Sequence, residues 1–336
     1  METSIFDYDL PEDRIAQVPL PRRESSRMLL LKGQLIEDRR FEDFPDLLKA
    51  DDCVVFNDSR VFPARLRDGT TEILFLRHIG EHTLWEALCK PARRFRPGTT
   101  AHLKGLEFKV EPPSGHYGKR MLRLLNKADL LSELSRVGEP PLPPYIHRHG
   151  DPALRSMDVE RYQTIFAKNP GSAAAPTAGL HFPQEMIRRI EEKCMTAWIT
   201  LHVSNATFQP IRCMNIEDHR MDPEAYVVSE EAAAAINSAN RLIAVGTTVV
   251  RAIESAASND GLIRPGASAT SAYITPGYQF RAVDCLLTNF HQPRSSLLVL
   301  VSAFAGAEEI RGAYRHALDQ SYRFLSYGDC MFISPS

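Results

Sequence analysis

The feature that most constrains the fold is a change in hydrophobic pattern along the 336-residue chain. Between residues 63 and 144, short runs of alternating apolar and polar residues recur at 72–79, 83–89, 106–110 and 121–125, separated by turns rich in glycine and proline. Short strands at this spacing are typical of a small β-barrel or sandwich. The proline-rich stretch 139–145 cannot be helical, because each proline removes a backbone donor and restricts the residue before it. We therefore expect residues 63–144 to form a β-rich insertion.

The rest of the chain has the pattern of an α/β protein. A buried strand is predicted at 52–57, and after residue 180 predicted helices at 183–193, 230–240 and 249–257 alternate with strands at 197–203 and 242–245. Strands that alternate with helices favour a largely parallel sheet. Residues 1–62 and 145–336 are therefore expected to form one large α/β domain around the insertion.

Composition excludes several classes of protein. No window approaches the ~18 consecutive apolar residues of a membrane-spanning helix. The N-terminus is acidic and lacks the basic stretch of a secretory signal, so we expect a cytoplasmic protein without membrane contact. The six cysteines include no close pair and the eleven histidines no HExxH spacing, so we expect no metal.

Positive charge is concentrated in the insertion. The chain has a net charge of −2, yet residues 86–128 hold ten Lys or Arg against three Glu, a local net charge of +7. A second basic cluster comprises Arg22, Arg23 and Arg27. A solvated surface and a polyanion contact explain these charges equally well. If the contact is with nucleic acid, the residues expected to bind it are Arg93, Arg94, Arg96, Lys119 and Arg120.

Residues 242–251 read as a strand, a tight turn and a helix. Backbone N–H groups and the helix dipole at such a turn favour an anion, which Gly246, Thr247 and Thr248 would hold. An ordinary strand-to-helix turn explains the segment equally well. Neither a phosphate-binding loop nor a G-x-G-x-x-G fingerprint is present.

Two further loops carry candidate catalytic groups. In 171–182, small residues surround a proline and lead through Thr177 to His181, so the backbone can approach a ligand closely. Asn289 and His291 follow a predicted strand at the position where open α/β sheets bind ligands. A structural hydrogen bond is an equally good explanation for either histidine.

Polar residues near other strand ends complete the set of candidates. Asp58 and Arg60 follow the strand at 52–57, and Asp329 precedes a predicted last strand at 330–333. Turn formation by the two aspartates is as good an explanation as ligand binding.

Taken together, these segments resemble the S-adenosylmethionine:tRNA ribosyltransferase-isomerase family. The matching sequence motifs run in the family's order from residue 6 to residue 333. They are Phe6-Asp-Tyr-Asp-Leu-Pro, Ile15-Ala-Gln, Val55-Phe-Asn-Asp-Ser-Arg-Val-Phe-Pro-Ala-Arg-Leu66, Pro140-Pro-Leu-Pro-Pro-Tyr-Ile146, Glu160-Arg-Tyr-Gln-Thr-Ile-Phe-Ala-Lys168, Ala174-Ala-Pro-Thr-Ala-Gly-Leu-His-Phe182, Ala244-Val-Gly-Thr-Thr248, Pro276-Gly-Tyr278, Thr288-Asn-Phe-His291, Val301-Ser-Ala-Phe-Ala-Gly306 and Tyr322-Arg-Phe-Leu-Ser-Tyr-Gly-Asp329.

The resemblance implies a large mixed α/β sheet domain with a small inserted β-barrel domain. It implies that the enzyme transfers and isomerises the ribosyl group of S-adenosylmethionine onto 7-aminomethyl-7-deazaguanine at the wobble position of tRNA, giving epoxyqueuosine and releasing adenine and methionine. S-adenosylmethionine is then a substrate, and no cofactor is expected. The partners are tRNAs with GUN anticodons (Asp, Asn, His and Tyr), and we expect a monomer.

The resemblance also suggests roles for the candidate residues. Gly246, Thr247 and Thr248 would bind the methionine carboxylate of the donor, with other polar contacts from Asp58, Arg60, Arg251 and Asn289. A neutral histidine would take a proton from the carbon beside the sulfonium, because a protonated one would repel the positive charge. We expect this base to be His181, with His291 second and His202 third. Asp329 or Thr177 would assist the departure of adenine.

The chain departs from the family pattern at several positions. Ser204 and Ala206 replace glycines, Asp222 replaces a histidine, and Gln292 replaces a leucine. A relative that binds tRNA without this chemistry is one alternative, which the change at 222 favours. An ordinary methyltransferase is the other, disfavoured because no glycine-rich loop follows an N-terminal strand.

Overall fold

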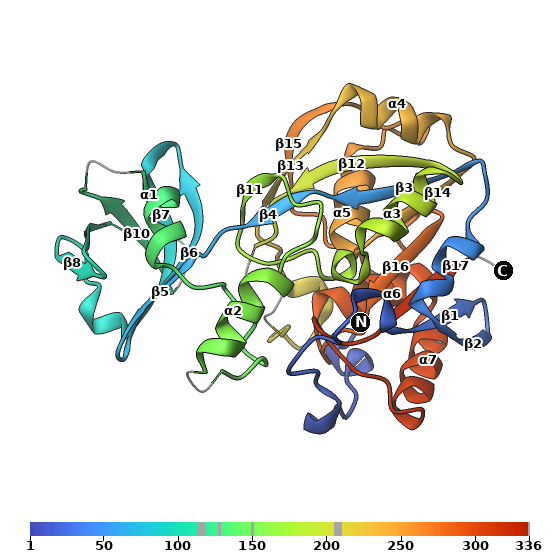
Figure 1. Cartoon of the computed structure of the whole chain (residues 1–336), viewed down its shortest axis with the longest axis horizontal. Helices are drawn as coiled ribbons and strands as arrows, with labels where there is room; N and C mark the ends of the chain where they lie inside the picture. The colour runs from blue at the N-terminus through green and yellow to red at the C-terminus, as the bar shows by residue number, and fades with distance from the viewer. Residues whose placement is uncertain (113–117, 127–128, 149–150, 205–209, 335–336) are drawn as a thin grey trace.

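A nine-stranded mixed sheet forms the centre of the computed structural model, which describes residues 1–112, 118–126, 129–148, 151–204 and 210–334 (Figure 1). In sheet order its strands are β15 (Gly266–Thr270), β13 (Glu224–Val228), β12 (Met195–Leu201), β3 (Asp52–Asn57), β14 (Arg241–Val245), β16 (Cys285–Asn289), β17 (Cys330–Ser334), β1 (Arg27–Lys32) and β2 (Leu35–Arg40).

Only the centre of this sheet is parallel. Strands β12, β3, β14 and β16 run in one direction, and β1 is parallel to β17, but the other four pairings are antiparallel. The prediction of a largely parallel sheet is therefore wrong towards the edges. At one edge the reason is a hairpin: β1 turns directly into β2 through Gly33, whose φ of 57° favours glycine.

Helices cover both faces of the sheet. Successive side chains of a strand point to opposite faces, so Val55 of β3 packs in one core while Val54 and Phe56 pack in the other. The first core is closed by α4 (Glu230–Ser238), α5 (Thr247–Ala256), α6 (Ser296–Ala305) and α7 (Ala307–Asp319), the second by α3 (Gln184–Glu191) and the 3-10 helix η4 (Phe41–Leu47). The large domain is thus a three-layer α/β/α structure.

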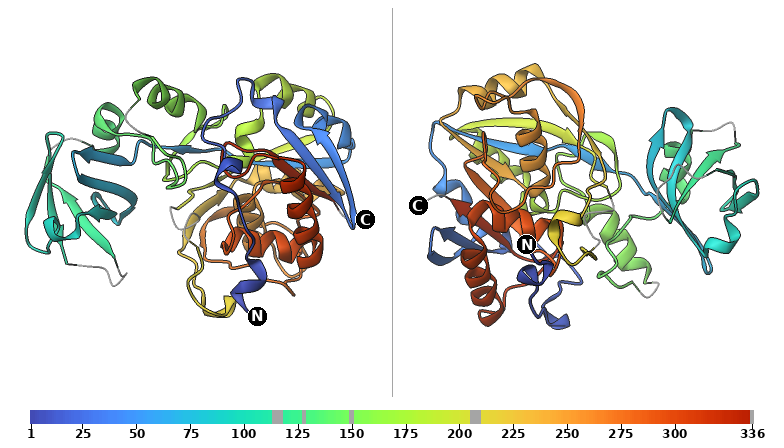
Figure 2. Two further views of the ribbon diagram at one scale, coloured as in Figure 1. Left: turned by 90° about the horizontal axis from the view of Figure 1, so that it is seen from below. Right: turned by 180° about the vertical axis from the view of Figure 1, so that it is seen from behind.

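The β-rich insertion forms a separate lobe (Figures 1 and 2). Its six antiparallel strands, in sheet order, are β5 (Arg65–Asp68), β6 (Thr71–Ile79), β7 (Glu81–Lys90), β10 (Lys119–Leu124), β9 (Leu106–Glu111) and β8 (Thr100–Leu103). The lobe has its own apolar core, which α1 (Leu130–Val137) helps to close. Within the described ranges the edge strands β5 and β8 are not paired, so the sheet is a curled half-barrel, and a closed barrel stays a prediction.

The chain enters and leaves this lobe side by side. Arg65 and Glu139 form an antiparallel bridge with N–H to O distances of 3.2 and 2.8 Å. Helix α2 (Pro152–Arg161) follows, and a short parallel pair, β4 (Ser59–Val61) and β11 (Asn169–Ser172), joins the two ends of the insertion to the large sheet. The remaining elements are short 3-10 helices, namely η1 (Thr3–Phe6), η2 (Glu12–Arg14), η3 (Arg23–Ser25), η5 (Ala92–Arg94), η6 (Thr177–His181) and η8 (Ile216–Asp218).

The large helices are too short or too polar to span a bilayer in the part of the chain that the structure describes. In the same part, no three His, Cys, Asp or Glu side chains lie close enough together to hold a metal ion.

Candidate active site

The predicted site segments meet at one edge of the large sheet. Because β3, β14 and β16 are parallel, their carboxyl ends share this edge, and Asp58, Gly246 and Asn289 lie there. Strand β17 is antiparallel to β16, so Asp329 precedes its first residue at the same edge. The 3-10 helix η6 brings His181 to Asn289. Residues far apart in the sequence thus form one cluster.

His181 is buried with both ring nitrogens engaged. Its Nδ1 lies 2.9 Å from Ser26 Oγ, and its Nε2 lies 3.2 Å from the Asn289 amide nitrogen. Asn289 Nδ2 also donates to the carbonyl of Leu325 at 3.1 Å, which fits an amide that donates to His181 Nε2. Burial and the nearby Arg23 guanidinium lower the pKa of His181 to about 3, so the ring is uncharged at neutral pH.

His291 is also buried and uncharged, but its surroundings differ. Its Nε2 lies 2.8 Å from Thr288 Oγ1, and burial lowers its pKa to about 3. Two tyrosines fix its backbone: Tyr8 Oη donates to its carbonyl at 2.5 Å, and its N–H donates to Tyr314 Oη at 2.9 Å. Sequence reasoning missed both tyrosines; Tyr8 stands in the first motif word, but no pattern links it to residue 291.

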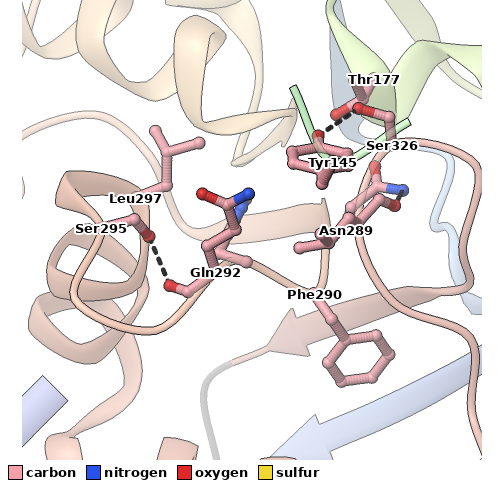
Figure 3. A pocket seen from close by; sticks show the side chains of 10 residues that line it. Tyr145, Thr177, Asn289, Phe290, Gln292, Ser295, Leu297 and Ser326 are labelled. Atoms are coloured by element: carbon pink, nitrogen blue, oxygen red, sulfur yellow. Dashed lines mark hydrogen bonds between the residues drawn. The ribbon is translucent and has the colours of Figure 1, made fainter. Parts of the chain in front are cut away.

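Two small cavities lie beside His291. Figure 3 shows side chains that line one of them. Both are lined by Thr177, His291 and Leu297; one extends to Asn289 and the other to Thr248. Each has a volume of about 40 Å³, whereas sites for drug-sized ligands span ~300–1,000 Å³. A ligand of nucleoside size can therefore bind only if a wall of the site moves.

One wall is a tyrosine that sequence reasoning did not single out. Tyr145, on the proline-rich segment, lies over the cavity, and its hydroxyl is 2.6 Å from Ser326 Oγ (Figure 3). Gln292 also lines this cavity. The segment that leaves the insertion thus contacts the site directly.

Two buried polar atoms at the cavities have no hydrogen-bond partner among the described residues. They are Thr248 Oγ1 and Asn289 Oδ1. A buried oxygen without a donor costs about 1–3 kcal/mol, so such atoms are uncommon unless a ligand or water completes them. Both were expected to contact the donor substrate, and both point to a polar ligand here.

The backbone at the start of α5 leaves room for a ligand to approach it closely. Gly246 precedes the helix with φ 98° and ψ 151°, and no side chain caps the first turn. Thr247 and Thr248 are the first two helical residues and line the second cavity with Gly246. The positive end of the helix dipole, with no side chain capping it, therefore faces the cavity, as an anion site requires.

Other expected donor contacts have protein partners or lie outside these cavities. The Asp58 carboxylate accepts hydrogen bonds from Thr200 Oγ1 at 2.6 Å and from Asn169 Nδ2 at 3.1 Å. Arg251 pairs with Glu224 inside the protein and donates to a backbone carbonyl. Arg60 is exposed on β4.

Asp329 shapes a turn. Its two carboxylate oxygens accept the backbone N–H groups of Arg27 and Arg323 at 2.9 and 2.8 Å. Burial raises its pKa. A direct role in chemistry would require these bonds to break.

The expected nucleic-acid residues divide into two groups. Arg93 and Arg96 are exposed, and within the described ranges their guanidinium groups form no hydrogen bond or ion pair. Arg94 donates to Thr71 Oγ1, and Arg120 donates to the Phe95 carbonyl at 2.9 Å.

Lys119 connects the two lobes. Its ammonium lies 2.9 Å from Asp222 Oδ2 and 3.4 Å from Glu86 Oε2. Asp222, a departure from the family pattern, therefore ties the large domain to the insertion.

Comparisons with known proteins agree with this geometry. The sequence matches the family described as queuosine biosynthesis protein over residues 3–333. It is 46% identical over 340 residues to the S-adenosylmethionine:tRNA ribosyltransferase-isomerase of Aromatoleum aromaticum, covering 98% of this chain and 96% of that one. The protein of the same name from Nitrosospira multiformis is 45% identical over 356 residues, covering 99% and 98%.

A solved structure supports the same assignment. The crystal structure of the S-adenosylmethionine tRNA ribosyltransferase of Thermotoga maritima matches with a TM-score of 0.55 and 32% identity, covering 98% of this chain and all of that one. Sequence and structure agree over nearly the full length. The chain belongs to the S-adenosylmethionine:tRNA ribosyltransferase-isomerase family of queuosine biosynthesis.

Proposed function

We propose that this protein transfers and isomerises the ribosyl group of S-adenosylmethionine onto 7-aminomethyl-7-deazaguanine at the wobble position of tRNA, releasing adenine and methionine. The observation that carries the proposal is the cluster at the sheet edge. There, two uncharged imidazoles stand beside two buried oxygens that have no hydrogen-bond partner in the described part of the chain. A sulfonium substrate needs an uncharged base, and its nucleoside needs polar partners.

The donor binds with its carboxylate at the start of α5. The dipole at this helix end favours an anion, and Gly246 leaves room for it. Thr248 Oγ1 and Asn289 Oδ1 gain hydrogen bonds from the ligand. The donor contacts expected from Asp58, Arg60 and Arg251 are secondary, because two of these side chains are already engaged and the third is exposed.

His291 acts as the base. The sulfonium acidifies the adjacent 5′ carbon, a base takes a proton there, adenine leaves, and the amine of the tRNA base adds before methionine departs. His291 lines both cavities, whereas His181 lines neither and has both ring nitrogens engaged, with Ser26 and Asn289. The order expected from the sequence, with His181 first, is therefore reversed here.

Thr177 assists the departure of adenine. Its side chain lines both cavities and can donate to a ring nitrogen of the leaving base. Asp329 supports the turn that carries Ser326, since both its oxygens already accept backbone N–H groups.

The tRNA contacts the insertion. Residues 63–144 act as a barrel-like domain whose Arg93 and Arg96 contact phosphates, with weaker contributions from Arg94, Lys119 and Arg120. The substrates are tRNAs with GUN anticodons, the enzyme works as a monomer in the cytoplasm, and it needs no cofactor.

A labelling experiment tests the function. The enzyme is incubated with precursor-containing tRNA and S-adenosylmethionine labelled either in the ribose or in the methyl group. Ribose label should enter the RNA, and methyl label should not. Methyl transfer would show a methyltransferase, and transfer of neither label by an enzyme that binds tRNA would show a relative without this chemistry; either result contradicts the proposal.

A further inference from the structure

The N-terminal basic cluster separates into paired and unpaired arginines. Arg27 lies 3.3 Å from Asp38 Oδ1 and stacks over the Tyr322 ring, 3.8 Å from its centroid. Arg22 lies 2.6 Å from Glu24 Oε1. Arg23 instead donates only to backbone carbonyls, including that of Leu180 at 3.0 Å.

A second arginine of this kind lies beside Arg23. Arg161, the last residue of α2, donates to the carbonyls of Pro21 and Leu20 at 3.1 and 2.9 Å, while its Nε is buried without a partner among the described residues. Neither Arg23 nor Arg161 forms an ion pair with any residue that the structure describes. Burial and the charge of Arg161 lower the pKa of Arg23 to about 10, and the exposed Glu160 opposes this effect weakly.

Both arginines line a shallow pocket with no acidic residue in its wall. The wall consists of Pro19, Leu20, Arg22, Arg23, Ser26, Arg161, Leu180, His181, Ser326, Tyr327 and Gly328. Glu24 and Glu160 lie near enough to offset part of their charge, but neither lines the pocket. The two partly buried guanidiniums repel each other and lose hydration, a cost that a bound anion would reduce. The planar fork of arginine suits phosphate and carboxylate oxygens.

The pocket adjoins the reaction site. His181 forms part of its wall, and Ser326 lines both this pocket and the cavity beside His291. An anion held here therefore lies next to the cavity beside His291.

We propose that Arg23 and Arg161 bind a backbone phosphate of the tRNA adjacent to the nucleotide that accepts the ribosyl group. This inference rests on the proposed function. The donor's carboxylate is the competing anion, but the start of α5 already provides a site for it on the other side of Asn289. Arg22, which is exposed and paired with Glu24, adds a third positive charge at the rim of the same pocket.

The test compares Arg161→Ala with Arg161→Lys. Binding of precursor-containing tRNA is measured over a range of salt concentrations, and binding of S-adenosylmethionine is measured separately. Arg161→Ala should weaken tRNA binding about tenfold or more, as expected for a charged hydrogen bond, and flatten the log–log salt slope by about one. Donor binding should be unchanged. Arg161→Lys should keep the native slope, because it keeps the charge.

The lysine variant separates phosphate binding from a structural role. If Arg161 only holds the backbone carbonyls of Leu20 and Pro21 in place, both variants should weaken tRNA binding equally. Equal effects would therefore contradict the proposal. Arg311→Ala is the matched control, since Arg311 is an exposed arginine paired with Glu308 on α7; it should bind tRNA normally. An anticodon stem-loop with an uncharged methylphosphonate beside the target nucleotide should reproduce the loss, and the loss should not grow further with Arg161→Ala.

Other outcomes are also decisive. A native salt slope for Arg161→Ala overturns the phosphate site, and weakened donor binding with intact tRNA binding assigns the pocket to the donor's carboxylate instead. Failure of the unmodified protein to bind tRNA at all would overturn the proposed function itself rather than this site.

Discussion

Two histidines at the edge of the large sheet are buried and uncharged, whereas two arginines on the surface of the inserted lobe are exposed and charged. At the sheet edge, His181 and His291 are buried, held by hydrogen bonds and kept uncharged. On the lobe, Arg93 and Arg96 are exposed, and their guanidinium groups form no hydrogen bond or ion pair with another described residue. Fixed, uncharged groups in a dry site suit chemistry, because their orientation and charge are set before the substrate arrives. Mobile exposed cations suit attraction of a polyanion.

Of the changes considered, removal of the His291 imidazole should have the largest effect, and the quantity affected is turnover. If His291 is the base, His291→Ala should lower turnover about 10²–10⁴-fold while both substrates still bind. His181→Ala is the matched control; it removes the neighbouring buried imidazole and should leave more activity. Near-native turnover of His291→Ala together with a large loss in His181→Ala would return the role to His181. Single-turnover rates with measured binding constants decide between them.

Acid should destabilise the sheet edge. Both histidines have a pKa of about 3 in the folded protein and ~6.5 when unfolded. The unfolded chain therefore takes up protons first as the pH falls below ~6.5, and stability is lost from there down towards pH 3. Between pH 6.5 and 5 each histidine should lower the free energy of unfolding by about 2 kcal/mol. Urea unfolding of the native protein and of His181→Asn at both pH values should show a smaller pH dependence for the variant; equal dependence would refute the buried neutral state.

The lobe should show the opposite behaviour, namely sensitivity to salt. Arg93→Ala combined with Arg96→Ala should flatten the log–log salt slope of tRNA binding by about two and weaken binding about tenfold. The reason is that a complex with two fewer phosphate contacts releases fewer counterions when it forms. Donor binding should not change. Arg94→Ala is the comparison variant and should have a smaller effect, since this side chain is already bonded to Thr71. An unchanged slope in the double variant would remove the lobe from the tRNA interface.

The smallest expected effect concerns Thr248. Its hydroxyl is buried without a partner in the described structure, so Thr248→Val should not destabilise the free protein. Loss of one neutral hydrogen bond should raise the donor's dissociation constant about 2–10-fold and leave tRNA binding unchanged. Thr270→Val is a suitable control, because that buried threonine already bonds to Ser255 and lies outside both cavities. Isothermal titration showing a larger effect on tRNA than on the donor would contradict the assignment.

Local patterns predicted some of the strands and α-helices and missed others, among them β1, β2, α6 and α7. The strand expected at 52–57 coincides with β3, and the helix expected at 230–240 is α4 at Glu230–Ser238. Both have strong signals, a run of buried residues and an alanine-rich helix. The short strands β5 and β8 were not predicted, because four residues are too few to show alternation.

Contacts between distant segments could not be predicted in the same way. Motif words identified His181, Asn289 and His291, but nothing local shows that Asn289 joins His181 rather than His291. The tyrosine supports of His291 and the wall formed by Tyr145 depend on tertiary packing alone. Lys119 looked like a phosphate ligand by charge, whereas in the fold it pairs with Asp222.

The division between the two regions can be tested most directly by hydrogen exchange with each substrate alone. S-adenosylmethionine should protect backbone amides at 246–250 and 287–292 and leave the lobe unchanged. Precursor-containing tRNA should protect residues 92–96 and 118–124 even without the donor. The account is contradicted if the donor protects the lobe but not the sheet edge, or if tRNA binds without protecting any part of the lobe.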